Sequence, residues 1–115
     1  MKPVKPTSKE RVEHVLNAIQ LIESFSQNYT LQSFLEDKKT LYACLYQYTI
    51  IGEATANIGN TILKKYDYPW SKVKSFRNFI LHEYHAIEMR VIWHTTWETL
   101  PGLKEMMQKI LANEF

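Results

Sequence analysis

Apolar residues recur at spacings of three and four along most of the chain, which is the period of an amphipathic helix. Before the first run, Thr7 and Glu10 stand in the positions of a capping box, where a hydroxyl and a carboxylate satisfy the free amides at a helix start. A first helix is therefore predicted to run to about Gln27. Its inward face comprises Val12, Val15, Leu16, Ile19 and Ile22.

The middle of the chain predicts a short helix and then a long one. Thr30 can cap the short helix, which extends through Leu35. The long helix is expected from about Lys38 to Lys64. One of its faces ends in small residues, which allow another backbone to approach closely. That face comprises Leu41, Leu45, Tyr48, Gly52, Ala56 and Gly59.

A second face of the long helix places one acid, Glu53, among aromatic and aliphatic residues. Glu53 is either a solvated or paired surface charge or a carboxylate with a functional role, and the spacing by itself leaves both interpretations open. The residues of this face are Tyr42, Tyr46, Ile50, Glu53 and Asn57.

Three more helices are predicted in the second half of the chain. Pro69 disfavours a helical conformation at the residue before it, so a fourth helix begins one or two residues after Pro69. A fifth helix is expected over about residues 87–99, and Leu100-Pro101-Gly102 should end it. The last helix should run over about residues 101–112, since proline is tolerated in a first turn. Its inward residues are Leu103, Met106, Met107 and Ile110.

These elements predict an all-α fold. No strand-like alternation, repeat or low-complexity tract occurs, and 115 residues suffice for one modest core. We therefore expect an up-and-down helical bundle of about five to six helices with short connections. Residues 1–7 are expected to form a flexible N-terminal arm, and residues 8–115 a single helical domain.

The composition indicates the cellular compartment of the protein and the partners that it can have. Cys44 has no partner for an internal disulfide, so nothing favours an oxidising compartment. Residues 1–10 lack the apolar run of a signal peptide, and no stretch approaches the roughly 20 apolar residues that span a bilayer. We expect a cytoplasmic protein with no membrane partner. The net charge of +2 is small, so any nucleic-acid site must be local.

The segment Arg77 to Tyr84, Arg-Asn-Phe-Ile-Leu-His-Glu-Tyr, combines the side chains that phosphodiester chemistry needs. Arginine binds phosphate through a planar fork of donors, and histidine exchanges protons near neutral pH. Helical geometry turns Asn78 and His82 away from the inward residues Val73, Phe76, Ile80, Tyr84 and Ile87. The side chain of Arg77, about 7.5 Å from His82 along the axis, is long enough to reach a shared substrate.

The simpler interpretation is that Arg77 and Asn78 are surface residues and that His82 is a cation tolerated at a helix end. The local charge argues against it. Five bases and one acid, Asp67, fall within fourteen residues, leaving nine bases and eleven acids elsewhere. This excess favours an anion-binding surface around the motif. The candidate RNA-binding lysines are Lys64, Lys65, Lys72 and Lys74.

A metal or cofactor is not expected. The sequence His82-Glu83-Tyr84-His85 is one residue too short for the helical His-Glu-x-x-His zinc motif. No Glu-x-x-His pair of the kind that holds two irons in a helical bundle occurs in the chain. There is also no glycine-rich phosphate loop.

The chain resembles the HepT-like toxins of the HEPN superfamily from about Ser8 to Leu111. The resemblance rests on an order of segments that is more specific than Arg-x4-His alone. These segments are Ile50-Ile51-Gly52-Glu53-Ala54, Tyr68-Pro69-Trp70, Arg77-Asn78 with His82-x-Tyr84, and Val91-Ile92-Trp93 before Leu100-Pro101.

The resemblance implies a metal-independent endoribonuclease toxin that forms a homodimer and pairs with a nucleotidyltransferase antitoxin. It implies that Arg77 and His82 are catalytic, that Asn78 and Glu53 support them, and that Tyr84 receives a nucleotide, AMP, from the antitoxin. The alternative is a non-catalytic HEPN helical module that binds a nucleotide or a partner nucleotidyltransferase. The intact Arg77 and His82 pair favours the nuclease.

Overall fold

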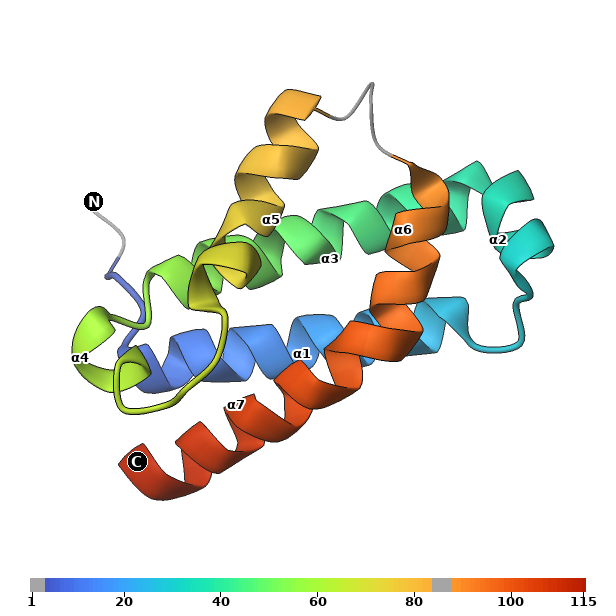
Figure 1. The fold of residues 1–115 in the computed structure, drawn as a ribbon. Coiled ribbons are helices and arrows are strands. Elements are labelled where there is room, and N and C mark those ends of the chain that lie inside the picture. Colours follow the sequence, from blue (N-terminus) through green and yellow to red (C-terminus); the bar gives the residue numbers. More distant parts are fainter. Residues whose placement is uncertain (1–3, 84–87) are drawn as a thin grey trace.

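The computed structural model describes residues 4–83 and 88–115, and these residues form an all-α bundle, as predicted. Figure 1 shows α1 and α3 side by side, with α5 leaning on α3 and α7 lying along α1. No helix in the described ranges is long and apolar enough to cross a membrane. The elements are α1 (Ser8–Ser26), α2 (Leu31–Glu36), α3 (Lys38–Ala56), α4 (Asn60–Leu63), α5 (Trp70–Glu83), α6 (Met89–His94), the π-helical η2 (Thr95–Thr99) and α7 (Leu100–Glu114).

The predicted starts of the first two helices are confirmed. The amide of Glu10 donates to Thr7 Oγ1 at 3.1 Å, and the amide of Thr7 donates to Glu10 Oε1 at 2.9 Å, which completes the capping box of α1. Thr30 caps α2 in the same way, with Ser33 in place of the acid. The expected N-terminal arm lies partly outside the described residues, because residues 1–3 are not among them.

The predicted long helix is wrong in its second part, because α3 ends at Ala56 and a separate short helix, α4, follows. The side chain of Asn57 donates to the backbone carbonyl of Glu53 at 2.8 Å, so it occupies an acceptor at the helix end. Gly59 then adopts a φ of 104°, a left-handed value that glycine tolerates and other residues rarely adopt. The chain therefore turns before residue 60.

The predicted stop at Leu100-Pro101-Gly102 is also wrong, because α6, η2 and α7 follow one another without a gap. Pro101 lies in the first turn of α7, a position at which proline is common. The buried hydroxyl of Thr96 donates to the carbonyl of Ile92 at 2.9 Å and lies 2.7 Å from the hydroxyl of Tyr48. This contact with α3 accompanies the wider π-helical turn.

The core fills the space between α1, α3, α5 and α7. The predicted inward residues of α1 are buried except Leu16, which is partly buried, and Met106 of α7 is likewise only partly buried. Cys44 is buried, and burial raises the pKa of its thiol. Large residues with almost no exposed surface include Tyr48, Phe34, Ile19, Ile22, Ile51, Leu63, Leu100, Leu103, Met107 and Ile110.

The backbones of α3 and α5 lie close together at Gly52. A Cβ atom added to Gly52 would lie 2.6 Å from the backbone nitrogen of Arg77 and 3.2 Å from the carbonyl oxygen of Lys74. The backbone that packs against the face of small residues is therefore that of α5, in the same chain. Ala56 is exposed, and no atom of the described residues lies within 4 Å of a Cβ built on Gly59. This face therefore gives no argument for a second subunit.

Replacing Gly52 by alanine should lower the free energy of unfolding by about 1–2 kcal/mol. The added methyl group would press on the backbone of α5, and overpacking of this kind outweighs the better helix propensity of alanine. Urea unfolding followed by circular dichroism measures the change.

Gly102→Ala is the matched control. Gly102 is also helical, and among the described residues its Cβ would meet the hydroxyl of Tyr68, at an ordinary contact distance of 3.7 Å. This variant should be as stable as the wild type or gain up to about 1 kcal/mol. Equal stability of the two variants would contradict a tight contact at Gly52.

Candidate functional site

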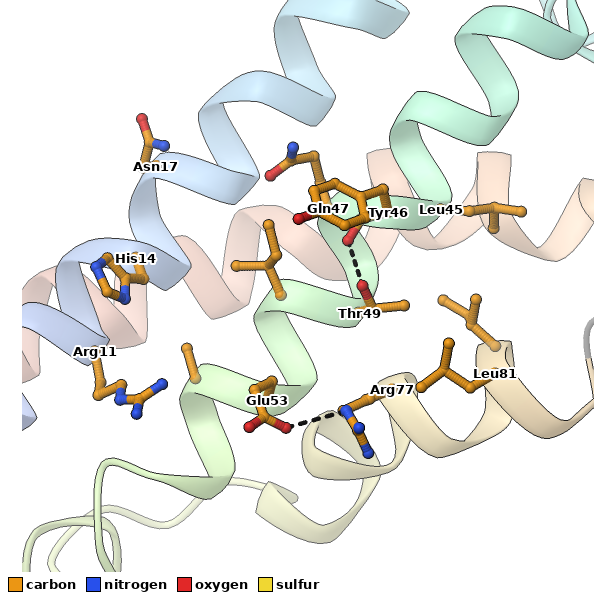
Figure 2. A pocket seen from close by; sticks show the side chains of 13 residues that line it. Arg11, His14, Asn17, Leu45, Tyr46, Gln47, Thr49, Glu53, Arg77 and Leu81 are labelled. Carbon is orange, nitrogen blue, oxygen red and sulfur yellow. Dashed lines mark hydrogen bonds and ion pairs between the residues drawn. The ribbon is translucent and has the colours of Figure 1, made fainter. Parts of the chain in front are cut away.

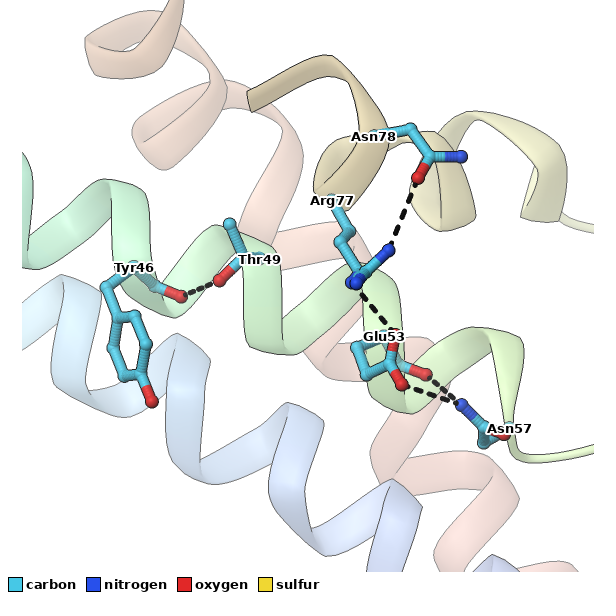
Figure 3. Close-up of polar contacts among 6 residues, drawn as sticks. All are labelled: Tyr46, Thr49, Glu53, Asn57, Arg77 and Asn78. Atoms are coloured by element: carbon cyan, nitrogen blue, oxygen red, sulfur yellow. Dashed lines mark hydrogen bonds and ion pairs between the residues drawn. The ribbon is translucent and has the colours of Figure 1, made fainter. Parts of the chain in front are cut away.

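The contact between α3 and α5 brings Arg77 to Glu53. The guanidinium Nε of Arg77 lies 3.1 Å from Glu53 Oε2, and Figure 3 shows the two side chains bridging the helices. Their side chains are 45% and 52% exposed, so the ion pair is a surface pair. Such a pair contributes little to stability, but it fixes the direction of the arginine fork.

The pair belongs to a row of polar side chains across the two helices. Asn57 Nδ2 lies 3.5 Å from Glu53 Oε1, and Arg77 Nη1 donates to Asn78 Oδ1 at 3.5 Å. Asn78 is exposed, as helical geometry predicted. The open question about Glu53 is answered in part, since Glu53 is a paired charge and its partner is the predicted catalytic arginine. The guanidinium retains other N–H donors for a ligand.

Two aromatic contacts hold α5 in this position. Trp70, its first residue, donates from the indole Nε1 to the carbonyls of Leu63 and Tyr66, at 3.0 Å each. Further along, Phe76 packs edge-on against the buried ring of Tyr48 with ring centres 5.5 Å apart. Trp70 thus ties the start of α5 to the preceding segment, and Phe76 packs the helix against α3. Asn78 and Phe79 of the same helix are exposed.

Two of the predicted site residues cannot be placed in full. His82 lies in the last turn of α5, but its side chain is outside what the structure describes, and Tyr84 lies outside the described residues altogether. Their roles remain predictions.

Two of the four candidate RNA-binding lysines, Lys65 and Lys74, contact polar side chains of the same chain. Lys65 Nζ pairs with Glu114 Oε1 at 3.0 Å, and Lys74 Nζ donates to Asn60 Oδ1 at 3.1 Å. Lys64 and Lys72 are exposed. The same Glu114 carboxylate accepts a bond from Tyr66, which lowers the pKa of the acid. Lys65 thus ties the end of α7 to the segment before α5, and its predicted contact with RNA would compete with that pair.

A groove of about 670 Å³ lies beside the Arg77–Glu53 pair (Figure 2). The groove crosses α3, with α1 forming one wall and α5 the other. Its polar residues on α1 were not indicated by the sequence pattern. They follow one another at intervals of three along α1, but only packing reveals that they face α3. The residues that matter here are Arg11, His14 and Asn17 of α1, Tyr46, Ile50 and Glu53 of α3, and Arg77, Ile80 and Leu81 of α5.

Among residues 4–81 and 88–115, no group of three or more His, Cys, Asp or Glu side chains is placed to hold a metal ion. A metal-independent mechanism remains a prediction, because such a group is one route to metal chemistry among several.

The family described as Ribonuclease HepT-like matches residues 15–110. The chain belongs to this HepT-like ribonuclease family. The match includes Glu53, Arg77, Asn78, His82 and Tyr84, to which the resemblance in sequence attached roles. The predicted family is thereby confirmed, whereas the role of each residue is not tested by the match.

Similar proteins carry ribonuclease names. A "Probable ribonuclease HepT" of Thermococcus cleftensis is 35% identical, over 93% of this chain and 98% of that protein. A "Putative RNase" of Caldanaerobacter subterraneus subsp. tengcongensis is 27% identical, over 94% and 97%. A "Gamma-glutamylcyclotransferase and putative RNase" of Methanocaldococcus jannaschii is 29% identical, over 87% of this chain and 46% of that protein. No solved structure matches the chain.

Replacing Glu53 by Gln should reduce RNA cleavage by about tenfold to a hundredfold, because an arginine without its orienting partner is held less well for the substrate. The melting temperature should change little, since an exposed ion pair contributes at most about 1 kcal/mol. Initial rates over a range of RNA concentrations and thermal unfolding measure the two effects.

Glu98→Gln is the matched control, because the exposed carboxylate of Glu98 lies 3.6 Å from His94 Nδ1 and does not line the groove. If both variants cleave RNA at the wild-type rate, Glu53 has no part in the site.

Proposed function

We propose that this chain is a metal-independent endoribonuclease toxin that acts in the cytoplasm as half of a toxin–antitoxin pair. One observation carries the nuclease assignment: Arg77 is held on the surface by Glu53, 3.1 Å away, in a chain of a ribonuclease family. Arg77 and His82 lie on the same helix, about 7.5 Å apart along its axis. An arginine side chain is long enough to contact the phosphodiester on which an imidazole at position 82 acts.

In the proposed reaction the 2′-hydroxyl of the RNA is the nucleophile. A general base takes the proton of this hydroxyl while its oxygen forms a new bond to phosphorus. The bond from phosphorus to the 5′-oxygen breaks, and a general acid protonates that oxygen as it leaves. The products are a 2′,3′-cyclic phosphate and a 5′-hydroxyl, so no water is consumed in this step. Arg77 stabilises the negative charge that develops on the phosphorane-like transition state.

A homodimer would supply both proton-transfer groups. The motif of one chain contains a single histidine, His82, whereas two chains meeting along α5 would contribute two imidazoles and two guanidinium groups. Phe79 and Leu81, on α5 between Arg77 and His82, are 48% and 51% exposed. Large apolar side chains left on a surface are typical of protein interfaces. Sedimentation at tens of micromolar tests this assembly, and a monomer there would contradict it.

The proposed antitoxin is a nucleotidyltransferase that transfers AMP to Tyr84. A nucleotidyl group at this position would place an anionic phosphate near Arg77, seven residues earlier in the chain, and would block access of RNA to the guanidinium. Modification of the tyrosine would thus switch off the nuclease without unfolding it.

Purified protein should cleave single-stranded RNA in the presence of EDTA, and Arg77→Ala or His82→Ala should abolish this activity. General acid–base catalysis contributes about 10²–10⁴-fold, so the loss at His82 should be large while the fold is retained. Gel analysis of total RNA, with mass spectrometry of the product ends, measures the cleavage and the cyclic phosphate.

Arg90→Ala and His94→Ala are the matched controls, because both residues are exposed, lie on α6 and do not line the groove. Undiminished cleavage by His82→Ala, or cleavage only with a divalent metal, would contradict the mechanism. RNA or nucleotide binding without any cleavage would favour the alternative, a non-catalytic HEPN module.

The variant Tyr84→Phe should cleave RNA like the wild type but escape inactivation by the antitoxin. Phenylalanine keeps the ring and removes only the oxygen that would accept the nucleotide. Co-expression with the cognate nucleotidyltransferase, followed by mass spectrometry, should find added AMP on the wild type and none on the variant.

Tyr42→Phe is the control, since Tyr42 is an exposed tyrosine outside the motif. A nucleotide that maps to another residue, or is still present on Tyr84→Phe, would argue against Tyr84 as the acceptor.

A further inference from the structure

We infer that the α1 side of the groove binds the nucleotide next to the cleaved phosphodiester, with Arg11 holding a phosphate of that nucleotide and Tyr46 stacking on its base. This subsite rests on the proposed ribonuclease function and deepens it. Arg11 and Tyr46 line the same groove as Arg77 and Glu53. Arg11 precedes residues 15–110, which match the family, so the match does not account for it.

The charges of the groove favour a phosphate on the α1 side. In Figure 2, Arg11 points from α1 towards Glu53, on the side opposite Arg77. The Glu53 carboxylate already forms an ion pair with Arg77, with Oε2 3.1 Å from Nε. Within the described part of the chain, the side chain of Arg11 forms no ion pair. The groove therefore contains two guanidinium groups and one carboxylate, and its excess positive charge complements a phosphodiester backbone.

His14 is a second hydrogen-bond donor on the α1 side of the groove. His14 lies three residues after Arg11, so the two side chains share a face of α1, and both line the groove. An imidazole N–H can donate to a phosphate oxygen or to a ribose hydroxyl. The α1 wall of the groove thus contains a guanidinium group and an imidazole, both on the side that faces α3.

Tyr46 supplies a platform for a base. Tyr46 lies on the exposed face of α3, and the residue is 65% exposed. Its hydroxyl has no hydrogen-bond partner among the residues that the structure describes, so the ring is not fixed by a polar contact of its own. Ile50 provides apolar surface in the same groove. An exposed aromatic ring beside cationic groups is the usual arrangement for binding unpaired nucleotides.

The groove has a suitable size, and it restricts the substrate. A volume of about 670 Å³ lies within the range of small-ligand sites, so a nucleotide fits. A base that stacks on Tyr46 cannot also stay stacked in an A-form duplex. The subsite therefore requires at least one unpaired nucleotide beside the cleavage position.

Binding can be measured without cleavage. The probe is a fluorescein-labelled single strand of about ten nucleotides whose 2′-hydroxyls are methylated, which removes the nucleophile but keeps bases and phosphates. Fluorescence anisotropy in EDTA at several salt concentrations gives the affinity and its salt dependence. The proteins are the wild type, Arg11→Gln, Tyr46→Ala, Tyr46→Phe and two controls.

The two substitutions should have different signatures. Tyr46→Ala should weaken binding roughly 5- to 150-fold without changing the salt dependence, and Tyr46→Phe should bind like the wild type. Arg11→Gln should weaken binding and also reduce the slope of log affinity against log salt by about 0.7, the effect of one lost phosphate contact. Thermal unfolding should show that every variant is folded.

The controls change the same residue types outside the groove. Tyr42 lies one turn before Tyr46, is 54% exposed and does not line the groove, and Arg90 is exposed on α6. Tyr42→Ala and Arg90→Gln should bind like the wild type. If Arg11→Gln matches Arg90→Gln and Tyr46→Ala matches Tyr42→Ala, the subsite is wrong.

The proposed nuclease and the subsite can fail separately. Normal RNA cleavage by Arg11→Gln and Tyr46→Ala at limiting substrate would overturn the subsite and leave the nuclease in place. Binding that depends on Arg11 and Tyr46, in a wild-type protein that cleaves no RNA, would support the subsite and overturn the nuclease. Tight binding of free AMP at the same residues, with no binding of the single strand, would overturn an RNA subsite.

Discussion

The candidate site depends on one close contact between two helix backbones. Because Gly52 has no side chain, the backbone of α5 can pack directly against it. A Cβ atom at Gly52 would lie only 2.6 Å from the backbone nitrogen of Arg77. The residue next to this glycine is Glu53, and the residue at the contact on α5 is Arg77 itself. The absence of one methyl group thus places the two charged side chains within 3.1 Å of each other across the helix pair.

One side of α5 packs against the bundle, and the other presents polar side chains to solvent. Val73 and Ile80 are buried against the bundle, and Phe76 packs on Tyr48, so this side anchors the helix. Arg77 and Asn78 are exposed on the rest of its surface, where a large polymer can reach them. Most of the free energy of binding this helix to the bundle comes from the apolar side, because exposed ion pairs contribute little. The polar residues can therefore serve a ligand without supporting the fold.

The groove gives the site a second wall that the motif does not contain. Arg77 and Glu53 come from α5 and α3, while Arg11 and His14 come from α1, about forty residues before Glu53 in the chain. A substrate lying across α3 would touch all three helices. Chemistry at the motif and selection of an unpaired nucleotide would then reside on different elements, which can change independently of one another.

Local chemistry allowed the sequence by itself to determine the all-α class, the caps at Thr7 and Thr30, the inward faces of the helices and the exposure of Asn78. Each depends on helical period or on hydrogen bonds within a few residues. Gly52 and Gly59 look alike in the sequence, yet one fits a helix pair and the other lies in the turn before α4 with a φ of 104°.

Only the tertiary structure could separate these two glycines, since the difference lies in whether another backbone passes beside the residue. The same holds for the unbroken passage from η2 into α7, where buried Thr96 meets Tyr48 of α3 at 2.7 Å. It holds too for Glu53 as the partner of Arg77, and for Arg11 in the same groove. Helical period fixes the face on which a side chain lies, but the packing of whole helices decides which other face it meets.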